Sequence, residues 1–291
     1  MSVFDELANL VRTVGDAAGP AVVAIGTRGR GTGFVVAPGK VLTNAHNLRD
    51  RTTQVTFADG RSVQAAVTGS DIDGDLVVLD VDTASVAPLA WADEPPGAGD
   101  LIVAITAGRH RRRVVWGQVT ATEAGFTGPR GRPITGALEH AAPSAPGSSG
   151  APVLDRDGRV VGINTHRLDY GLYLARTVDA TLRSTVDGMS EGRTFTPAVL
   201  GVALAPQHVA SRLRSAVGLA DRDGLLVRDV AADSPAARAG VRAGDLLVRA
   251  GEQDLRRHED LFAVLGTLGT GDQLALGLVR GAEELSVTVT F

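Results

Sequence analysis

The sequence predicts a mostly β chain of two units, a sandwich or barrel of short strands followed by a compact α+β module. Short apolar runs separated by Gly, Pro and Asp predict closely spaced antiparallel strands in the first unit, rather than alternating strands and helices. The 36 glycines and an aromatic content of 4% agree with many turns and an aliphatic interior. A length of 291 residues is enough for about two domains with separate cores.

The chain opens with a predicted amphipathic helix. Apolar residues recur at helical spacing from Phe4 to Val14, and Ser2 is placed to cap the first turn. Early acidic residues and the lack of an unbroken apolar core distinguish this segment from a signal peptide. No later run reaches the roughly 18 apolar residues that span a bilayer. We therefore expect a cytoplasmic protein that does not contact a membrane.

The first unit is predicted to extend through residues 1–187. Its strands are expected in the runs AVVAIG, GTGFVVA, KVLTNA, QVTFADG, LVVLDV, LIVAIT, RVVWGQVTA, APVLD and RVVGINT. The polar segment 188–197 is predicted to be a linker that ends at Pro197. The second unit, 198–291, has strand patterns in LGVAL, GLLVRDV, GDLLVRAGEQ, QLALGLVR and ELSVTVTF, with helical patterns in SPAARAG and HEDLFAVLGTL.

Composition excludes several functional classes. A net charge of −4 gives no electrostatic reason to expect nucleic acid binding. The absence of cysteine removes disulfides, thiolate catalysis and cysteine-based zinc sites. The sequence contains neither a phosphate-binding G-x-x-x-x-G-K-[ST] loop nor a visible cluster of metal ligands. We therefore expect neither a cofactor nor a metal.

The heptapeptide PGSSGAP, residues 146–152, contains two candidate nucleophiles. Gly147 precedes Ser149 by two residues and Gly150 follows it, which allows a tight turn with backbone N–H groups aimed at one point. Such a nest is what an oxyanion hole requires, and Ser148 is placed less well relative to the glycines. A turn of small residues with no chemistry is the alternative interpretation of the same segment.

A serine nucleophile needs a histidine base that is held by a carboxylate. His46 ends the predicted strand VLTNA, where its side chain can be aimed rigidly. Asp75 opens the apolar run DLVVL, where a buried acid would have to accept hydrogen bonds. His110, in the basic run RHRRR, and His140 and His166 lack such a setting.

The order of these residues resembles one known arrangement. An α/β-hydrolase elbow would be G-x-S-x-G opening a helix, but here Ala151 takes the last position and a predicted strand follows. The segments GPAVVAIG, GTGFVVA, LTNAH, GDLVVLDV, PGSSGAPVLD and VVGINT, then LGVALAP and GLLVRDVAADSPAARAGVRAGDLLVRAGEQ, resemble the HtrA (Deg) serine proteases over about residues 15–291. The resemblance implies two six-stranded antiparallel β-barrels, chymotrypsin-like, followed by a C-terminal α+β PDZ domain.

The resemblance also implies roles for individual residues. His46 would be the general base, Asp75 its orienting acid and Ser149 the nucleophile, and the backbone amides of Gly147 and Ser149 would form the oxyanion hole. The implied function is an ATP-independent serine endopeptidase of protein quality control, cleaving unfolded or PDZ-recognised polypeptides. A catalytically weak chaperone or scaffold that binds peptides through the PDZ groove is the alternative.

In the PDZ unit, the resemblance points to two elements around the ligand. Leu200, Gly201 and Val202 match the carboxylate-binding loop. Leu261 and Leu265, on the second predicted helix, either face the ligand or belong to the core.

The chain departs from the family pattern near Ser149 and in the specificity pocket. Ser148 and Ala151 stand where the family commonly has asparagine and glycine. Pocket positions fall on Ser144, His166 and Arg167, which suggests a preference for polar or acidic side chains unless Arg167 points to solvent. Many relatives form trimers through N-terminal aromatics, and Phe4 is the aromatic residue of the first helix, so a homotrimer is a further expectation.

Overall fold

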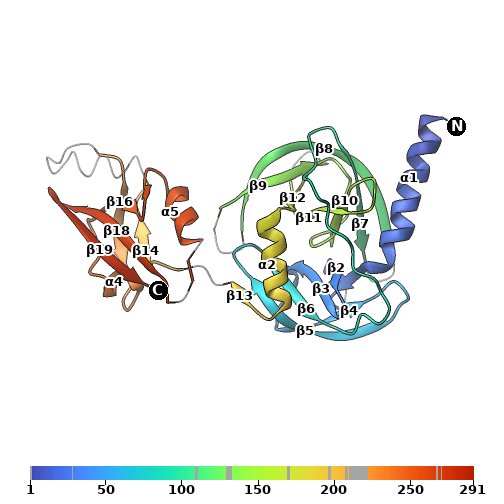
Figure 1. The fold of residues 1–291 in the computed structure, drawn as a ribbon, viewed down its shortest axis with the longest axis horizontal. Coiled ribbons are helices and arrows are strands. Elements are labelled where there is room, and N and C mark those ends of the chain that lie inside the picture. The colour runs from blue at the N-terminus through green and yellow to red at the C-terminus, as the bar shows by residue number, and fades with distance from the viewer. Residues whose placement is uncertain are drawn as a thin grey trace. The chain divides into compact units, whose positions relative to one another are not determined.

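The computed structural model describes residues 2–27, 29–108, 111–128, 133–168, 171–195, 198–206, 209, 222–266, 268–269 and 271–291. The chain divides into two compact units, Met1–Phe195 and Thr196–Phe291 (Figure 1). The finer boundaries of domain and linker stay a prediction. His110 and Pro197, which figured in the sequence predictions, lie outside the described residues.

Two closed barrels make up the first unit, as the sequence predicted. The first barrel closes in the order β1-β2-β3-β6-β5-β4, and the second in the order β10-β11-β12-β9-β8-β7, with antiparallel neighbours throughout. The strands of the first barrel are β1 (Val22–Ile25), β2 (Gly31–Ala37), β3 (Lys40–Asn44), β4 (Thr52–Thr56), β5 (Ser62–Asp71) and β6 (Leu76–Asp80). Those of the second are β7 (Leu101–Ala107), β8 (Arg112–Thr127), β9 (Pro133–His140), β10 (Pro152–Leu154), β11 (Val160–Arg167) and β12 (Tyr173–Thr177).

Some strands of the first unit, such as β1, are apolar at every position because both of their faces are buried. Side chains alternate between the two faces of a strand. In β1, Val22 and Ala24 therefore pack in a core shared by both barrels, while Val23 and Ile25 fill the first barrel. A separate cluster around Ile102 fills the second barrel. The shared core joins the two barrels.

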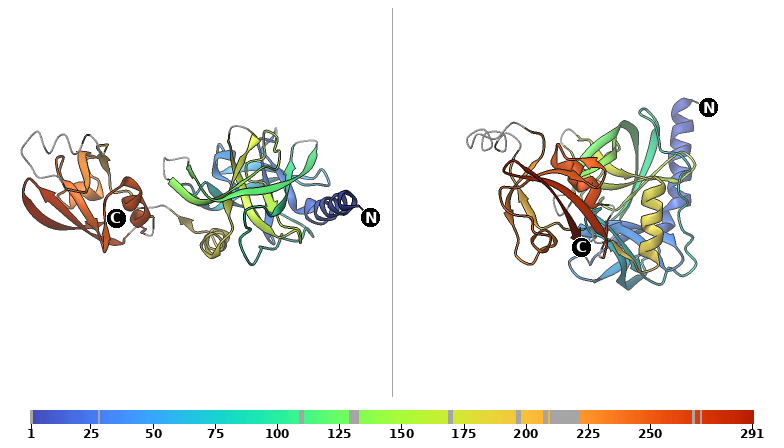
Figure 2. Two further views of the ribbon diagram at one scale, coloured as in Figure 1. Left: turned by 90° about the horizontal axis from the view of Figure 1, so that it is seen from above. Right: turned by 60° about the vertical axis from the view of Figure 1, so that its left-hand side comes forward.

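Helices complete the first unit. Helix α1 (Val3–Ala18) has the predicted cap, since the Ser2 hydroxyl accepts from the Asp5 N–H and the Asp5 carboxylate accepts from the Ser2 N–H. Its N-terminal turn projects beyond the barrel strands (Figure 2). Two short 3₁₀ helices, η1 (Gly19–Ala21) and η2 (Ala45–Asn47), adjoin β1 and β3.

Part of the segment predicted as a linker is ordered on the first barrel. Helix α2 (Ala180–Ser190) runs into it, and β13 (Thr194–Phe195) pairs in parallel with β5. Met189 is buried in the shared core and Phe195 packs against it. The polar residues between them conceal these two apolar anchors in the sequence pattern.

The second unit is the predicted α+β module. Its sheet has the order β14-β15-β16-β18-β19, with β17 paired to β16. The elements are β14 (Val202–Leu204), β15 (Leu225–Val230), α4 (Pro235–Arg238), β16 (Leu246–Ala250), β17 (Gln253–Asp254), α5 (His258–Leu265), β18 (Gln273–Arg280) and β19 (Glu283–Thr290). Both helices fall in the segments that the sequence predicted to be helical.

Candidate active site

His46 is placed by the end of β3. The strand runs directly into η2, which carries the histidine, so the predicted position at a strand end is confirmed. The Asn44 side-chain amide and the Ala45 N–H both donate to the Asp75 carbonyl oxygen, at 2.9 and 3.1 Å. These two bonds tie the histidine segment to the loop that carries Asp75.

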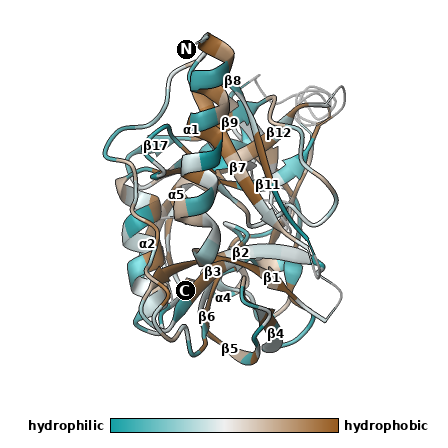
Figure 3. Cartoon of the chain, turned by 90° about the vertical axis from the view of Figure 1, so that its right-hand side faces the viewer, coloured by the Kyte–Doolittle hydropathy of each residue, from teal (hydrophilic) through white to brown (hydrophobic). Residues whose placement is uncertain are grey.

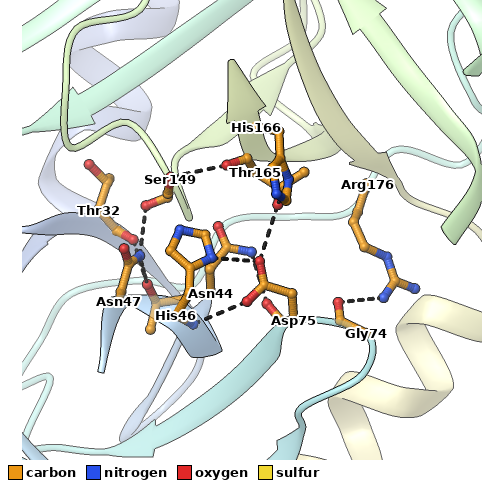
Figure 4. Close-up of polar contacts among 11 residues, drawn as sticks. Thr32, Asn44, His46, Asn47, Gly74, Asp75, Ser149, Thr165, His166 and Arg176 are labelled. Atoms are coloured by element: carbon orange, nitrogen blue, oxygen red, sulfur yellow. Dashed lines mark hydrogen bonds and ion pairs between the residues drawn. The ribbon is translucent and has the colours of Figure 1, made fainter. Parts of the chain in front are cut away.

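The Asp75 carboxylate is fully buried and accepts three hydrogen bonds (Figure 4). His46 Nδ1 lies 2.7 Å from Oδ2, the His46 backbone N–H donates to Oδ1 at 3.1 Å, and Thr165 Oγ1 donates to Oδ2 at 3.2 Å. Several donors are what a buried carboxylate requires. Because an ionised carboxylate only accepts, Nδ1 carries the proton and Nε2 of His46 is left to act as a base.

The loop of Ser149 is fixed to both barrels. The Ser149 carbonyl oxygen accepts from the Thr32 N–H and from the Asn47 side-chain amide, each at 2.9 Å. Thr32 Oγ1 donates to the Gly147 carbonyl at 2.8 Å. On the other side, the Gly150 N–H donates to the carbonyl of Asn164, in β11, at 2.7 Å. Thr32, Asn47 and Asn164, from three different segments, therefore hold the loop's backbone.

The two small residues after Ser149 meet different requirements. Gly150 has φ +84°, and a Cβ there would overlap the Thr32 carbonyl oxygen, so glycine is required. Ala151 is fully buried and is not among the residues with positive φ. An alanine is therefore accommodated where the family commonly has glycine.

The Ser149 hydroxyl donates to the carbonyl of Thr165 at 3.1 Å, not to His46 (Figure 4). The hydroxyl must therefore turn away from Thr165 before His46 can take its proton. Among the described residues, the backbone N–H groups of Gly147 and Ser149 donate to no acceptor. Uncommitted N–H donors beside a nucleophile are what an oxyanion hole needs.

The predicted pocket residues lie in different environments. Ser144 is buried, with its hydroxyl 3.3 Å from the Ala142 carbonyl that it donates to. The His166 ring is half-buried, 6.2 Å from the His46 ring and 4.9 Å from that of Phe126 between centroids. Burial lowers the pKa of His166, although the nearby Asp75 charge opposes this. Arg167 is exposed, which favours the alternative that it faces solvent.

Sequence reasoning missed several residues that support the site. Thr165 contacts both Asp75 and Ser149, and Asn44, Asn47 and Thr32 hold their backbones. The available signal was a polar side chain inside an apolar strand, as in NAHN and INT. Such a residue is expensive to bury unless it has partners.

His140, which precedes the Ser149 loop in the sequence, is fully buried. Its Nδ1 accepts from the Ala142 N–H at 3.2 Å, so Nε2 carries the proton and donates to Asn164 Oδ1 at 2.7 Å. Burial lowers the pKa of His140, although the hydrogen bond to Asn164 opposes this. The histidine is therefore held neutral.

Most of the residues predicted to bind a PDZ ligand lie in the core of the second unit or shape its backbone. Gly201 has φ +80°, and a Cβ there would overlap Ser234. Leu200, Leu261 and Leu265 are buried in the core of this unit, which favours the core alternative for the two helix residues. Val202 begins β14, which pairs only with β15 among the described residues, so its other edge is open. The ligand-binding roles of these residues stay predictions.

Two further observations concern ions and membranes. In the described part of the chain, no group of three or more His, Cys, Asp or Glu side chains could hold a metal ion. Among the described helices, none is both long and apolar enough to cross a membrane.

Comparison with known proteins agrees with this geometry. Residues 31–163 match the trypsin-like peptidase domain and residues 198–291 match the PDZ domain. Serine protease HTRA2, mitochondrial, of Bos taurus is 29% identical over 97% of this chain and 67% of its own length. A probable periplasmic serine endoprotease DegP-like of Halomonas elongata is 29% identical over 90% of this chain and 56% of its own length. This chain thus spans about half to two thirds of the curated relatives' length.

Solved structures share the fold. The HtrA-type protease AlgW with a decapeptide superposes with a TM-score of 0.80 at 21% identity, covering 96% of this chain and 97% of that chain. The serine endoprotease from Yersinia pestis gives 0.76 at 22% identity, covering 96% of each chain. A chymotrypsin-like protease domain followed by one PDZ domain therefore makes this chain homologous to the HtrA (Deg) serine proteases.

Proposed function

We propose that this protein is a serine endopeptidase that cleaves polypeptides through an acyl-enzyme on Ser149. The observation that carries the proposal is the buried Asp75 carboxylate, 2.7 Å from His46 Nδ1, beside a serine loop with uncommitted N–H donors. His46 Nε2 takes the Ser149 proton as Oγ attacks the scissile carbonyl, and later gives it to the leaving amine. The N–H groups of Gly147 and Ser149 stabilise the oxyanion.

A fluorophosphonate probe tests this proposal directly, because it reacts only with an activated serine. We expect labelling of the wild-type protein and of Ser148→Ala, and none of Ser149→Ala. Casein hydrolysis should fall about 10⁶-fold in Ser149→Ala, as expected for loss of a triad serine. Labelling that persists in Ser149→Ala, or is lost only in Ser148→Ala, would contradict the assignment.

A second candidate function is a weakly active chaperone or scaffold that binds peptides through the PDZ unit. The Ser149 hydroxyl, which donates to the Thr165 carbonyl instead of to His46, favours this alternative. The two functions differ in one outcome. A protease is labelled by the fluorophosphonate, alone or once an added peptide shifts the hydroxyl toward His46, whereas a scaffold stays unlabelled under every condition.

The proposed substrates are unfolded or C-terminally exposed polypeptides, handled in protein quality control without ATP. The open edge of β14 supports this, since an extended peptide can add to such an edge as a further strand. Relatives solved with a decapeptide and a tripeptide are HtrA-type proteases of the same fold. Fluorescence anisotropy with a labelled peptide, against the same peptide amidated at its C-terminus, tests carboxylate recognition.

Cleavage preference is proposed to be polar or acidic, because the polar residues Ser144 and His166 occupy pocket positions implied by the family resemblance. The exposed Arg167 contributes only if it turns inward. A peptide-library cleavage profile checks the proposal. Preference for valine and alanine at the cleaved position, unchanged in Ser144→Ala, would contradict it.

We propose that a homotrimer forms through helix α1. Apolar residues lie on α1 and on the neighbouring strand β7 (Figure 3), and α1 also packs on β8. A groove of about 590 Å³ lies there, lined by residues that include Phe4, Leu7, Val11, Val114 and Trp116. Phe4 is 83% exposed and Trp116 46%. Sedimentation analysis of Phe4→Ser should show dissociation; an unchanged mass would contradict the proposal.

We also propose that the protein is located in the cytoplasm. The curated relatives carry mitochondrial and periplasmic names. Fractionation of cells that express the full chain, with compartment markers, checks it.

A further inference from the structure

Arg176 reaches from the second barrel to the loop that carries Asp75 (Figure 4). It lies on β12, where it is paired with Ile163 of β11. Its NH1 donates to the Gly74 carbonyl oxygen at 2.7 Å and lies 4.0 Å from Asp71 Oδ2. The side chains of Arg176 and Asp71 are 19% and 15% exposed, so the contact is largely shielded from water.

Gly74 is held on both sides. Its N–H donates to Asp71 Oδ1 at 2.8 Å, while its carbonyl accepts from Arg176. A Cβ at this position would overlap both the Asp71 carboxylate and the Arg176 guanidinium. Only glycine at this position therefore leaves room for the contacts of Asp71 and Arg176 with the Gly74 backbone.

The carbonyl that Arg176 holds belongs to the peptide unit that leads into Asp75. Asp75 has φ +57°, a backbone conformation that L-residues rarely adopt and that persists only where neighbours enforce it. The Asp75 N–H, in the same peptide unit, donates to the Ile72 carbonyl at 3.1 Å. Both ends of this unit are thus fixed, and its orientation sets where the Asp75 carboxylate points.

We propose that Arg176 is a positioning residue for catalysis, holding the Gly74–Asp75 peptide unit so that the Asp75 carboxylate stays directed at His46. The proposal deepens the proposed endopeptidase function and rests on it. Arg176 touches neither substrate nor the reacting atoms. A guanidinium suits the role because a charged donor binds a carbonyl more strongly than a neutral one, and the Asp71 carboxylate offsets its charge.

Kinetics of two variants test the role. Arg176→Met keeps the apolar length but removes every donor, and Arg176→Lys restores a charged donor. We expect kcat for a casein-derived peptide to fall about 10- to 100-fold in Arg176→Met, as for misplaced catalytic groups, with KM changed less than about two-fold. Arg176→Lys should recover part of the loss. Arg159→Met, which removes an exposed pair with Asp93, is the matched control and should behave as wild type.

A spectroscopic measurement separates positioning from general stability. The proton shared by His46 Nδ1 and Asp75 should give a downfield ¹H NMR signal in the wild type, and it should weaken or vanish in folded Arg176→Met while circular dichroism is unchanged. An unchanged signal in Arg176→Met, or wild-type kcat, overturns the proposal. If wild type shows no fluorophosphonate labelling, the endopeptidase function fails instead, and the NMR signal still decides the role of Arg176.

Discussion

The two halves of the candidate active site, the base half with His46 and Asp75 and the nucleophile half with Ser149, differ in how far they are assembled. The base half is complete, because His46 and Asp75 share a 2.7 Å contact and Asp75 also accepts from Thr165 and from the His46 N–H. The nucleophile half is incomplete, because the Ser149 hydroxyl donates to the Thr165 carbonyl and not to His46. A buried charge needs fixed partners, whereas a neutral hydroxyl can exchange one acceptor for another at little cost.

Thr165 is the residue common to both halves. Its hydroxyl donates to Asp75, while its carbonyl accepts from Ser149. The His46–Asp75 pair is therefore joined directly, whereas the Ser149 hydroxyl has still to exchange its acceptor. Substitutions in each half separate the fixed pair from the movable hydroxyl.

Asp75→Asn should impair the base half most severely. An asparagine amide would donate toward the imidazole and favour the wrong tautomer, so we expect kcat to fall about 10⁴-fold. Steady-state kinetics on a peptide substrate measure this. Asp80→Asn, at an exposed aspartate that pairs with Lys40, is the control. A loss of less than ten-fold in Asp75→Asn would show that the base half is not the fixed element.

Gly150→Ala should destabilise the nucleophile loop. The added Cβ meets the Thr32 carbonyl at a backbone angle that suits glycine, so the free energy of unfolding should fall by at least about 2 kcal/mol. Ala151→Gly, one residue later, should cost only about 1 kcal/mol, since Ala151 has no such constraint. Chemical denaturation measures both. Equal losses of unfolding free energy in the two variants would mean that the backbone at Gly150 is not specially constrained.

Thr165→Val should separate the two roles of Thr165. The substitution removes the hydroxyl that donates to Asp75 and keeps the carbonyl that accepts from Ser149. We expect kcat to fall about ten-fold, as for loss of one hydrogen bond to a charged group. Thr165→Ser retains the hydroxyl and should stay close to wild type. If both variants lose activity equally, packing and not the hydrogen bond is responsible.

The protease unit should lose stability as pH falls below about 6.5, the ordinary histidine pKa. Burial lowers the pKa of His140, so the unfolded chain binds the proton first and the fold loses free energy as pH decreases, by at most about 1.4 kcal/mol per pH unit. Thermal melting between pH 5 and 8 measures this. His140→Gln should flatten the dependence, and His166→Gln separates the contribution of His166, whose pKa burial also lowers. An unchanged slope in His140→Gln would contradict the prediction.

Sequence patterns predicted a sandwich or barrel and the α+β module, because each leaves a local mark, whereas the two-barrel arrangement and the triad roles were implied by the resemblance to the HtrA (Deg) proteases. Apolar runs mark strands buried on both faces, and a histidine or an acid beside such a run marks a polar group that needs a partner. Arg176 left no such mark, because it is an ordinary charged residue whose partner Gly74 is 102 residues away in sequence. Leu261 and Leu265 show the converse, since helical spacing alone does not tell a core face from a ligand face.

In the sequence, the local settings of His46, Asp75 and Ser149 made them candidates for one site, and the resemblance to the HtrA (Deg) proteases implied their roles. Only the tertiary structure decided how they are joined. Closure of two barrels brings β11 and β12 against the Asp75 loop, so Thr165 and Arg176 can reach it. The direction of the Ser149 hydroxyl depends on which acceptor the fold places nearer, and that choice is a property of packing, not of the heptapeptide PGSSGAP.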